Sequence, residues 1–138
     1  EKASMRNITL QCEGPDFVIC ANKSQITELF YNICDNAIKY NKDNGEVTFT
    51  LADAAVRISD TGIGIPPQYL SRIFERFFRV DKSHSKKVDG TGLGLSIAKH
   101  IARQNNITIS VESEVNKGTA FILTFKDVFR QNSSENLL

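Results

Sequence analysis

Apolar residues recur at helical spacing between residues 22 and 40. The positions on this stripe are Ile26, Leu29, Phe30, Ile33, Cys34, Ala37 and Ile38. Because residues three and four apart share one face of an α-helix, the spacing predicts a long helix that buries this face. Asn22 or Ser24 can cap its first turn, and the turn-rich segment 41–45 ends it. A second helical pattern covers residues 93–105.

Short runs of β-branched and apolar residues between turn residues predict the strands. These runs are 7–13, 17–21, 46–51, 55–59, 107–113 and 120–125. Pro66 and Pro67 suit the start of a short helix that would turn three apolar side chains inward: Leu70, Ile73 and Phe74. Residues 80–90 have almost no apolar content and predict a mobile loop. The order predicts an α/β two-layer sandwich, in which a mixed, mostly antiparallel sheet of about five strands packs against about three helices.

Chain length and charge narrow the class of protein. At 138 residues the chain fits one compact domain, which we expect at residues 1–130, with a poorly ordered polar tail at 131–138. Seventeen Lys and Arg residues against sixteen Asp and Glu give a net charge of +1, so no overall field attracts nucleic acid or an anionic membrane. No apolar run approaches the roughly 18 residues of a membrane-spanning helix.

The cysteine and histidine positions argue against a zinc site. Cys12, Cys20 and Cys34 are odd in number and lack a C-x-x-C spacing, so we expect reduced, partly buried thiols in a cytosolic protein. His84 and His100 have no zinc-ligand spacing with each other or with a cysteine.

The first polar cluster lies on the predicted helix 22–40. Asn32 and Asn36 are four residues apart, and with Lys39 and Tyr40 they occupy roughly one face, away from the apolar stripe. Carboxamide oxygens are ligands that suit Mg²⁺, and a lysine one turn onward can contact a phosphate. On these residues alone, an ordinary solvated helix face explains the pattern at least as well.

The second polar cluster follows the predicted strand 55–59. The carboxylate of Asp60 is an acceptor suited to an exocyclic amine such as that of adenine. Gly62 and Gly64 allow the backbone to approach a ring closely. On this segment alone, a plain turn with an incidental aspartate is the alternative interpretation.

The third cluster is a glycine-rich loop, Gly90-Thr-Gly92-Leu-Gly94-Leu95, which leads into the predicted helix 93–105. Free amides and the helix dipole attract phosphate at such an N-terminus. The segment before it has an excess of basic residues: Arg76, Arg79, Lys82, Lys86 and Lys87 against Asp81 and Asp89. For any one of these side chains, a solvated loop is the alternative. Neither a Walker loop nor a dinucleotide-binding G-x-G-x-x-G motif is present.

Taken in order, these segments resemble the catalytic, ATP-binding domain of bacterial sensor histidine kinases. That domain belongs to the Bergerat-fold family, which also includes type II topoisomerases, Hsp90 and mismatch-repair ATPases. Residues 28–40 resemble the N box, 60–66 the G1 box, 73–79 the F box and 90–95 the G2 box, and Gly118 with Thr119 matches the last glycine turn. The resemblance covers nearly the whole chain up to Phe125.

The resemblance implies a role for each cluster. Asn36, with Asn32, would hold Mg²⁺ against the phosphates of ATP. Lys39 would contact a phosphate, Tyr40 would border the nucleotide, and Asp60 would accept a hydrogen bond from the adenine amine. The other residues implied to line the nucleotide site are Gly62, Gly64, Ile65, Gly90, Thr91, Gly92, Leu93, Gly94, Leu95 and Thr119.

The resemblance also implies a lid over the triphosphate, formed by residues 79–90. Arg76 would be a contact of the γ-phosphate, which completes an expected catalytic set with Asn32, Asn36 and Lys39. Three aromatic residues of the F box would anchor the lid: Phe74, Phe77 and Phe78. Aromatic residues at such spacing are also common in an ordinary core.

One position separates the kinases from the hydrolytic members of the family. Those members carry a glutamate general base at the position of Asn32, and an amide cannot take a proton from water at neutral pH. Phosphoryl transfer to a histidine needs no such base, because catalysis is mainly positioning and charge neutralisation. We therefore expect a protein-histidine kinase domain rather than an efficient ATPase.

The chain lacks the phosphoacceptor pattern of the partner helical domain, and neither His84 nor His100 resembles an acceptor. We expect a monomeric catalytic domain that phosphorylates the dimerisation and histidine phosphotransfer domain of the same parent protein, and through it a response regulator. Family habit implies a cytoplasmic domain of a membrane-anchored bacterial protein. Two alternatives stay open: an anti-sigma-factor-type serine kinase, and a non-catalytic, nucleotide-gated interaction module.

Overall fold

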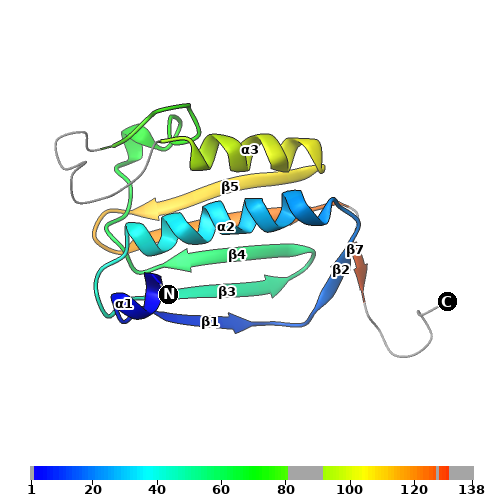
Figure 1. Cartoon of the computed structure of the whole chain (residues 1–138), viewed down its shortest axis with the longest axis horizontal. Coiled ribbons are helices and arrows are strands. Elements are labelled where there is room, and N and C mark those ends of the chain that lie inside the picture. Colours follow the sequence, from blue (N-terminus) through cyan, green and yellow to red (C-terminus); the bar gives the residue numbers. More distant parts are fainter. Residues whose placement is uncertain (1, 81–91, 127, 131–138) are drawn as a thin grey trace.

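The computed structural model describes residues 2–80, 92–126 and 128–130. Its elements, in chain order (Figure 1), are α1 (Lys2–Met5), β1 (Thr9–Glu13), β2 (Phe17–Ile19), α2 (Lys23–Lys39), β3 (Glu46–Ala52), β4 (Ala55–Asp60), the 3₁₀ helix η1 (Pro67–Tyr69), α3 (Gly94–Gln104), β5 (Ile107–Glu114), β6 (Gly118–Phe125) and β7 (Val128–Arg130). The predicted loop 80–90, except Val80, and the predicted tail 131–138 lie outside the described residues.

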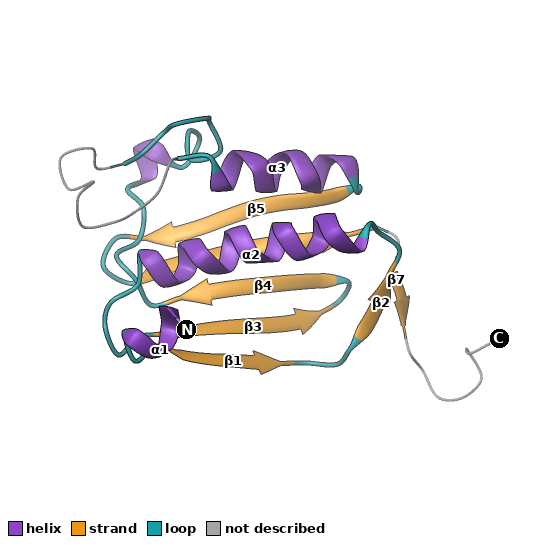
Figure 2. Ribbon diagram, in the orientation of Figure 1, coloured by secondary structure: helices purple, strands orange, loops and turns teal. Residues whose placement is uncertain are grey.

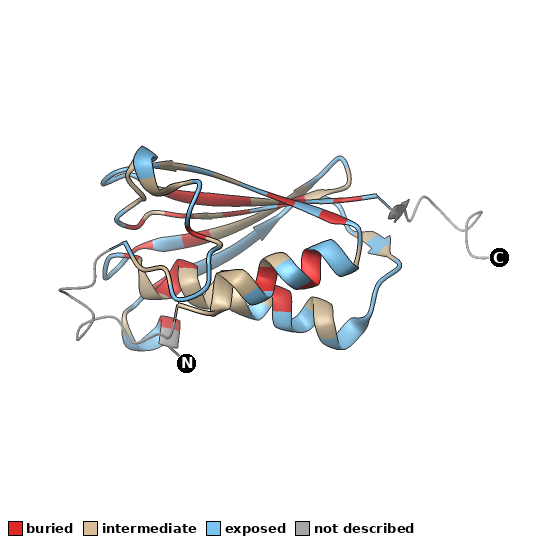
Figure 3. Ribbon diagram, turned by 90° about the horizontal axis from the view of Figure 1, so that it is seen from above, coloured by how far each residue is buried: buried red, intermediate tan, exposed pale blue. Residues whose placement is uncertain are grey.

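Five strands form one mixed sheet in the order β1-β3-β4-β6-β5. β1 runs parallel to β3, and the other neighbouring pairs are antiparallel. Both long helices cover the same face of this sheet, as Figures 2 and 3 show. The predicted two-layer α/β sandwich with a mixed, mostly antiparallel sheet is therefore confirmed. β2 and β7 pair separately, as a small antiparallel sheet.

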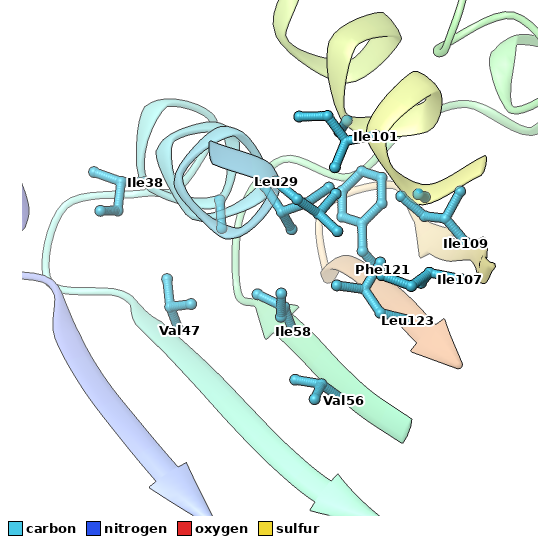
Figure 4. Close-up of a cluster of buried hydrophobic side chains, with 14 of the residues drawn as sticks. Leu29, Ile38, Val47, Val56, Ile58, Ile101, Ile107, Ile109, Phe121 and Leu123 are labelled. Atoms are coloured by element: carbon cyan, nitrogen blue, oxygen red, sulfur yellow. The ribbon is translucent and has the colours of Figure 1, made fainter. Parts of the chain in front are cut away.

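The core fills the space between the helices and the covered face of the sheet (Figure 4). Leu29 and Ile33 of α2 are completely buried, and so is Ile58 at the centre of β4. Phe121 and Leu123 of β6 meet them from the neighbouring strand. Burying a side chain of this size contributes about 1.5–3 kcal/mol. The predicted stripe of α2 is confirmed, since its members are buried or partly buried against the core: Ile26, Leu29, Phe30, Ile33, Cys34, Ala37 and Ile38.

The start of α2 follows one of the two predicted caps. Asn22 is the capping residue, because its side-chain oxygen accepts a hydrogen bond from the Gln25 amide at 3.0 Å. The helix then continues to Lys39, and its first turn lies at the opposite end of the sheet from its last turn. α2 therefore carries the predicted N box to one end of the molecule.

The short helix predicted to start at Pro66 and Pro67 does begin there, but as a 3₁₀ helix that ends at Tyr69, before the three residues it was expected to turn inward. Only the three-residue η1 forms, and the backbone hydrogen bonds that follow join residues three apart, such as Glu75 to Arg72. These tight turns still bury Ile73 and bring the Phe74 ring to 6.2 Å from that of Phe121, centroid to centroid. Packing against the sheet thus overrides the local helical pattern. The sequence pattern also did not predict the short elements α1 and β7.

Candidate functional site

Five helices and strands begin or end at one end of the sandwich, on the left in Figure 1. α2, β4 and β5 end there, and β6 and α3 begin there. The antiparallel pairing of β4 with β6 brings the end of β4 beside the start of β6. The fold therefore places the N box, the G1 box, the start of α3 and the last glycine turn at a common end.

Asp60 is the buried polar centre of this end. Its residue is only 8% exposed, and its Oδ1 accepts hydrogen bonds from the Gly62 amide at 2.8 Å and the Thr119 amide at 3.2 Å. Burial raises the pKa of the Asp60 carboxyl, and these two hydrogen bonds lower it in part. Oδ2 accepts no hydrogen bond from the described residues, so a ligand amine can use it.

Two glycines let the backbone close around Asp60. A Cβ atom on Gly62 would lie 2.2 Å from the carbonyl oxygen of Tyr40, and one on Gly118 would lie 1.9 Å from that of Asp60. Gly118 also has a φ of +134°, which side chains disfavour. Glycine is therefore required at both positions by contact with neighbouring backbone, while the predicted approach of Gly62 and Gly64 to a nucleotide ring stays a prediction.

Thr119 belongs to a small hydroxyl network beside Asp60. The Ser113 hydroxyl lies 2.8 Å from that of Thr119, accepts from the Ile65 amide at 2.7 Å and donates to the Gly118 carbonyl at 3.0 Å. Because Ser113 has a single proton, Thr119 is the donor in the hydroxyl pair. This leaves the oxygen of Thr119 as an acceptor for a ligand.

Ser113 was missed by sequence reasoning. It joins the G1 segment to the last glycine turn, through Ile65 on one side and Gly118 on the other. The signal was present, because residues 107, 109, 111 and 113 alternate on one face of β5 and only the last of them is polar. A polar residue at an inward strand position predicts a hydrogen-bonding partner.

The two predicted Mg²⁺ ligands lie on α2, partly buried. Asn32 faces the start of α3, since a Cβ atom on Gly94 would lie 3.7 Å from its Oδ1. The Nδ2 atom of Asn32 is buried without a hydrogen-bond partner. A rotation of the amide exchanges its oxygen and nitrogen, so either can occupy this unpaired position. The side-chain amide of Asn32 can therefore bind a cation through its oxygen or a phosphate through its nitrogen.

Lys39 and Tyr40 complete the N box. The Lys39 ammonium lies 3.0 Å from a carboxylate oxygen of Asp35, one turn earlier on α2. The predicted phosphate contact is therefore shared with an acidic neighbour on the same helix. Tyr40 is half-buried, and its carbonyl oxygen accepts from the Ile63 amide at 3.0 Å, which ties the end of α2 to the G1 segment.

The G2 box is partly described. Gly90 and Thr91 lie outside the described residues, and Gly92 accepts a hydrogen bond from the Phe77 amide at 2.9 Å. α3 begins at Gly94, and its N-cap residue Leu93 makes no side-chain capping bond. The first amides of a helix are donors that suit an anion. Leu95, in the first turn, packs against the core.

The F box divides into buried and exposed residues. Phe78 stacks near Tyr69, with ring centroids 5.8 Å apart, and the Arg72 guanidinium lies 4.5 Å from the Phe78 centroid. Phe77 is 66% exposed, and most of the lid that it was expected to anchor lies outside the described residues. Arg76, the predicted γ-phosphate contact, is exposed as well.

Other sequence-based expectations concern thiols, metals and membranes. The expectation of partly buried thiols is wrong for Cys12 and Cys20, which are exposed free thiols. It is confirmed for Cys34, where burial and the nearby Asp35 charge raise the pKa of the thiol. In the described ranges, no three His, Cys, Asp or Glu side chains are grouped as metal ligands. Within the same residues, no helix is long and apolar enough to cross a bilayer.

Comparison with known proteins identifies relatives over most of the chain. The family model "Histidine kinase-, DNA gyrase B-, and HSP90-like ATPase" matches residues 21–128. Sensor histidine kinase YkoH of Bacillus subtilis (strain 168) is 37% identical over 124 residues, which cover 88% of this chain and 27% of YkoH. The chain thus spans about a quarter of that relative.

Solved structures agree with this assignment. A structure of the mycobacterial sensor histidine kinase MprB matches with a TM-score of 0.78 at 28% identity, over 93% of this chain and 87% of that one. Full-length ShkA in complex with AMPPNP matches with a TM-score of 0.71 at 26% identity, over 91% of this chain and 28% of that one. The chain belongs to the family of histidine kinase-, DNA gyrase B- and HSP90-like ATPases, and within it to the catalytic ATP-binding domains of sensor histidine kinases.

Proposed function

We propose that this chain binds ATP with Mg²⁺ and supplies the catalytic half of a histidine phosphorylation. The observation that carries the proposal is Asp60, a buried carboxylate with one oxygen held by two backbone amides and the other without a partner among the described residues. Burying an ionisable group is unfavourable for stability, so a carboxyl kept in such a place indicates a functional role, which we assign as accepting from the adenine amine.

The same geometry favours adenine over guanine. At the position of the adenine amine, guanine carries a carbonyl oxygen, which would face the carboxylate of Asp60 as a second acceptor. Two acceptors cannot hydrogen-bond to each other, so both would stay unpaired in a buried place. This cost discriminates strongly against guanine. Thr119 offers an additional acceptor, and the half-buried Ile65 an apolar surface, beside the same carboxylate.

The phosphate end would use the other polar groups of the site. Asn36 and Asn32 would hold Mg²⁺, whose bound charge neutralises phosphate oxygens during transfer. Lys39 and the first amides of α3 would bind phosphates as fixed donors, together with Gly90 to Leu95 and the exposed Arg76. The unpaired amide of Asn32 supports this assignment, because a buried polar atom without a partner is rare unless a ligand completes it.

The residue at position 32 also selects the reaction. An asparagine cannot act as a general base toward water, so this chain is poorly equipped for hydrolysis. An imidazole is already a nucleophile, and its attack on the γ-phosphate forms the N–P bond while the bond to the ADP leaving oxygen breaks. What the chain's own residues do is hold the nucleotide, orient its last phosphate and neutralise charge.

The acceptor belongs to the rest of the parent protein. Because the chain corresponds to about a quarter of YkoH, we infer a parent with a dimerisation and histidine phosphotransfer domain that passes phosphate to a response regulator. By the same analogy with sensor histidine kinases, this domain would work on the cytoplasmic side of a bacterial membrane protein in a two-component system.

Phosphotransfer in trans tests the proposal. The chain is mixed with the purified dimerisation domain of its parent and ATP carrying a radiolabelled γ-phosphate. We expect acid-labile, alkali-stable label on the dimerisation domain. This label should be lost with Asn36→Ala. It should be kept with the control variant Glu112→Gln, which changes an exposed residue of β5. Acid-stable label on a serine would instead identify a serine kinase. ATP binding without any transfer would identify a nucleotide-gated interaction module.

A further inference from the structure

Arg6 makes an unusually complete set of contacts with the end of α2. One guanidinium nitrogen donates to the carbonyls of Ile38 and Lys39, and the other terminal nitrogen donates to that of Asn41. Its Nε donates to Asp43 at 3.0 Å. The side chain is 32% exposed, so these bonds are only partly open to water. No nucleotide-site role was expected of this residue from the sequence.

These contacts satisfy a known deficiency of helix ends. The last carbonyls of an α-helix have no intrahelical partner, and a cation at this end also interacts favourably with the helix dipole. A guanidinium presents several donors in one rigid plane, so it can bind three carbonyls at once where a lysine ammonium acts as a point charge. Arg6 therefore fixes the position of the last turn of α2.

The end of α2 in turn fixes the G1 segment. The carbonyl oxygen of Tyr40 accepts from the Ile63 amide at 3.0 Å, and Gly62 lies so close to it that a Cβ atom there would be 2.2 Å away. The Gly62 amide then donates to Asp60 at 2.8 Å. A second link runs from the Thr61 hydroxyl to the side-chain oxygen of Asn41 at 3.0 Å.

Packing makes this route stiff. Asn41 is only 4% exposed, and the nitrogen of its side-chain amide also donates to the Glu46 carbonyl at 3.0 Å. The Glu46 amide donates to the Thr61 hydroxyl at 2.9 Å, so Asn41, Glu46 and Thr61 form a closed ring of hydrogen bonds. A shift at the end of α2 must therefore move the segment that follows Asp60 rather than be absorbed between them.

We infer that Arg6 is a positioning residue for the nucleotide site, which acts through the last turn of α2 and Gly62 on the Asp60 carboxylate. This inference rests on the proposed function, because it assigns to Asp60 the binding of adenine. Misplacing a binding group by about 1 Å is enough to weaken its contribution strongly. Arg6 thus adds an N-terminal segment to a site otherwise built from the four boxes.

The test compares Arg6→Gln with Asn105→Ala. Asn105 is the matched control. Its side-chain amide donates to the Ile101 carbonyl at the end of α3 and to the Gln25 side chain at the start of α2, which is the end of α2 opposite to Arg6. For each variant, ATP affinity is measured by calorimetry, and the Gly62 amide is observed by NMR without nucleotide. We expect Arg6→Gln to shift the Gly62 amide and to raise the ATP dissociation constant about tenfold per folded molecule. Asn105→Ala should do neither, even where it lowers thermal stability equally.

Arg6→Lys keeps the charge and carries the test if Arg6→Gln does not fold. It should still shift the Gly62 amide and recover only part of the affinity. Unchanged Gly62 amides in both variants, or a loss of affinity equal to that of Asn105→Ala, would overturn the inference. If the unsubstituted chain binds no ATP, the proposed function fails, while the Gly62 amide still tests whether Arg6 sets the geometry around Asp60.

Discussion

Asp60 keeps a carboxylate where burial opposes its charge. Its Oδ1 is held by the amides of Gly62 and Thr119, and an asparagine oxygen could accept the same two hydrogen bonds. Neutral asparagine would therefore suit the fold at least as well as aspartate, while it would not suit the proposed amine contact. Stability and binding make opposite demands at this residue, as is common at functional sites.

The first prediction follows from the direction of this pKa shift. The folded pKa of Asp60 lies above its ordinary value of 3.8, so the folded state holds the proton more tightly than the unfolded state does. The stability linked to the proton is present below pH 3.8 and is lost as pH rises through the folded pKa. As pH rises from 3.8 through the folded pKa, Asp60→Asn should therefore become more stable relative to the unsubstituted chain. The difference in their free energies of unfolding should change by about 1.4 kcal/mol per unit by which the folded pKa is raised.

Urea unfolding of both proteins at a series of pH values measures this difference. Glu112→Gln is the control, because it removes an acidic charge on the exposed face, where Glu112 pairs with Arg57. A stability difference between Asp60→Asn and the unsubstituted chain that stays constant with pH would contradict the prediction.

The second prediction concerns Asp35, which pairs with Lys39 on α2 at 3.0 Å. Removing the acidic charge leaves Lys39 available to a phosphate and removes repulsion of the triphosphate. We expect Asp35→Asn to tighten ATP binding by about fivefold at low salt, and by less as salt screens the charges. Calorimetry at two ionic strengths measures this effect. Weaker ATP binding would show instead that Asp35 holds Lys39 in its productive position.

Sequence reasoning at this scale succeeded where residues stand in ordered motifs. Asn32 lies beside Gly94 of the G2 box and Asp60 beside Thr119 of the last glycine turn, although the role of each stays a prediction. It missed Arg6 because an arginine near a chain end carries no pattern of its own. The contacts of Arg6 join residues more than thirty positions apart, and only the folded chain reveals them.

Among the elements, the turn between β5 and β6 shows how closely the strands approach the site. Gly118 opens β6 directly against the backbone of Asp60, with no space for a Cβ atom and a φ of +134°. The side chain of the adjacent Lys117 makes an exposed ion pair with Glu114, at 3.1 Å. Neighbouring positions of one turn thus carry very different constraints.

The third prediction compares these two neighbours. Gly118→Ala should lower the free energy of unfolding by more than about 1 kcal/mol, because it combines backbone strain with a clash against Asp60. Lys117→Ala should stay within about 0.5 kcal/mol of the unsubstituted chain. Chemical denaturation measures both. Equal stabilities would mean that the turn can move away from β4 without loss.

The long elements were predictable and the short ones were not. α2, α3 and the strands of the main sheet have clear periodicity over five or more residues. α1 and β7 have four and three residues, too few to show a period. α1 exists because Ala3 and Ile8 are buried against the core, and the path after η1 exists because Ile73 and Phe74 pack on the sheet. Tertiary contacts decided these segments.

At the scale of the whole molecule, the two faces of the sheet differ in chemistry. The helices cover one face (Figure 3), and by the strand registers the other face carries polar side chains that include Thr48, Ser59 and Ser110. The register places Thr50 beside Arg57, and Arg57 binds Glu112 at 2.9 Å across the sheet. A surface of this kind has little apolar area with which to bind a second copy.

The fourth prediction is that the chain is monomeric in solution. Sedimentation velocity at micromolar concentration, with and without ATP and Mg²⁺, should show one species near the mass of a single chain, 15.4 kDa. A concentration-dependent dimer of this chain alone would contradict the prediction.

Calorimetric titration of ATP and GTP, with and without Mg²⁺, tests the proposed nucleotide site most directly. The titrations compare the unsubstituted chain with Asp60→Asn and Asn36→Ala. We predict binding selective for ATP, a loss of that selectivity in Asp60→Asn, and a loss of the Mg²⁺ contribution in Asn36→Ala. A folded chain that binds neither nucleotide at millimolar concentration, or that binds ATP equally well without the Asp60 carboxylate, would contradict the assignment of the site.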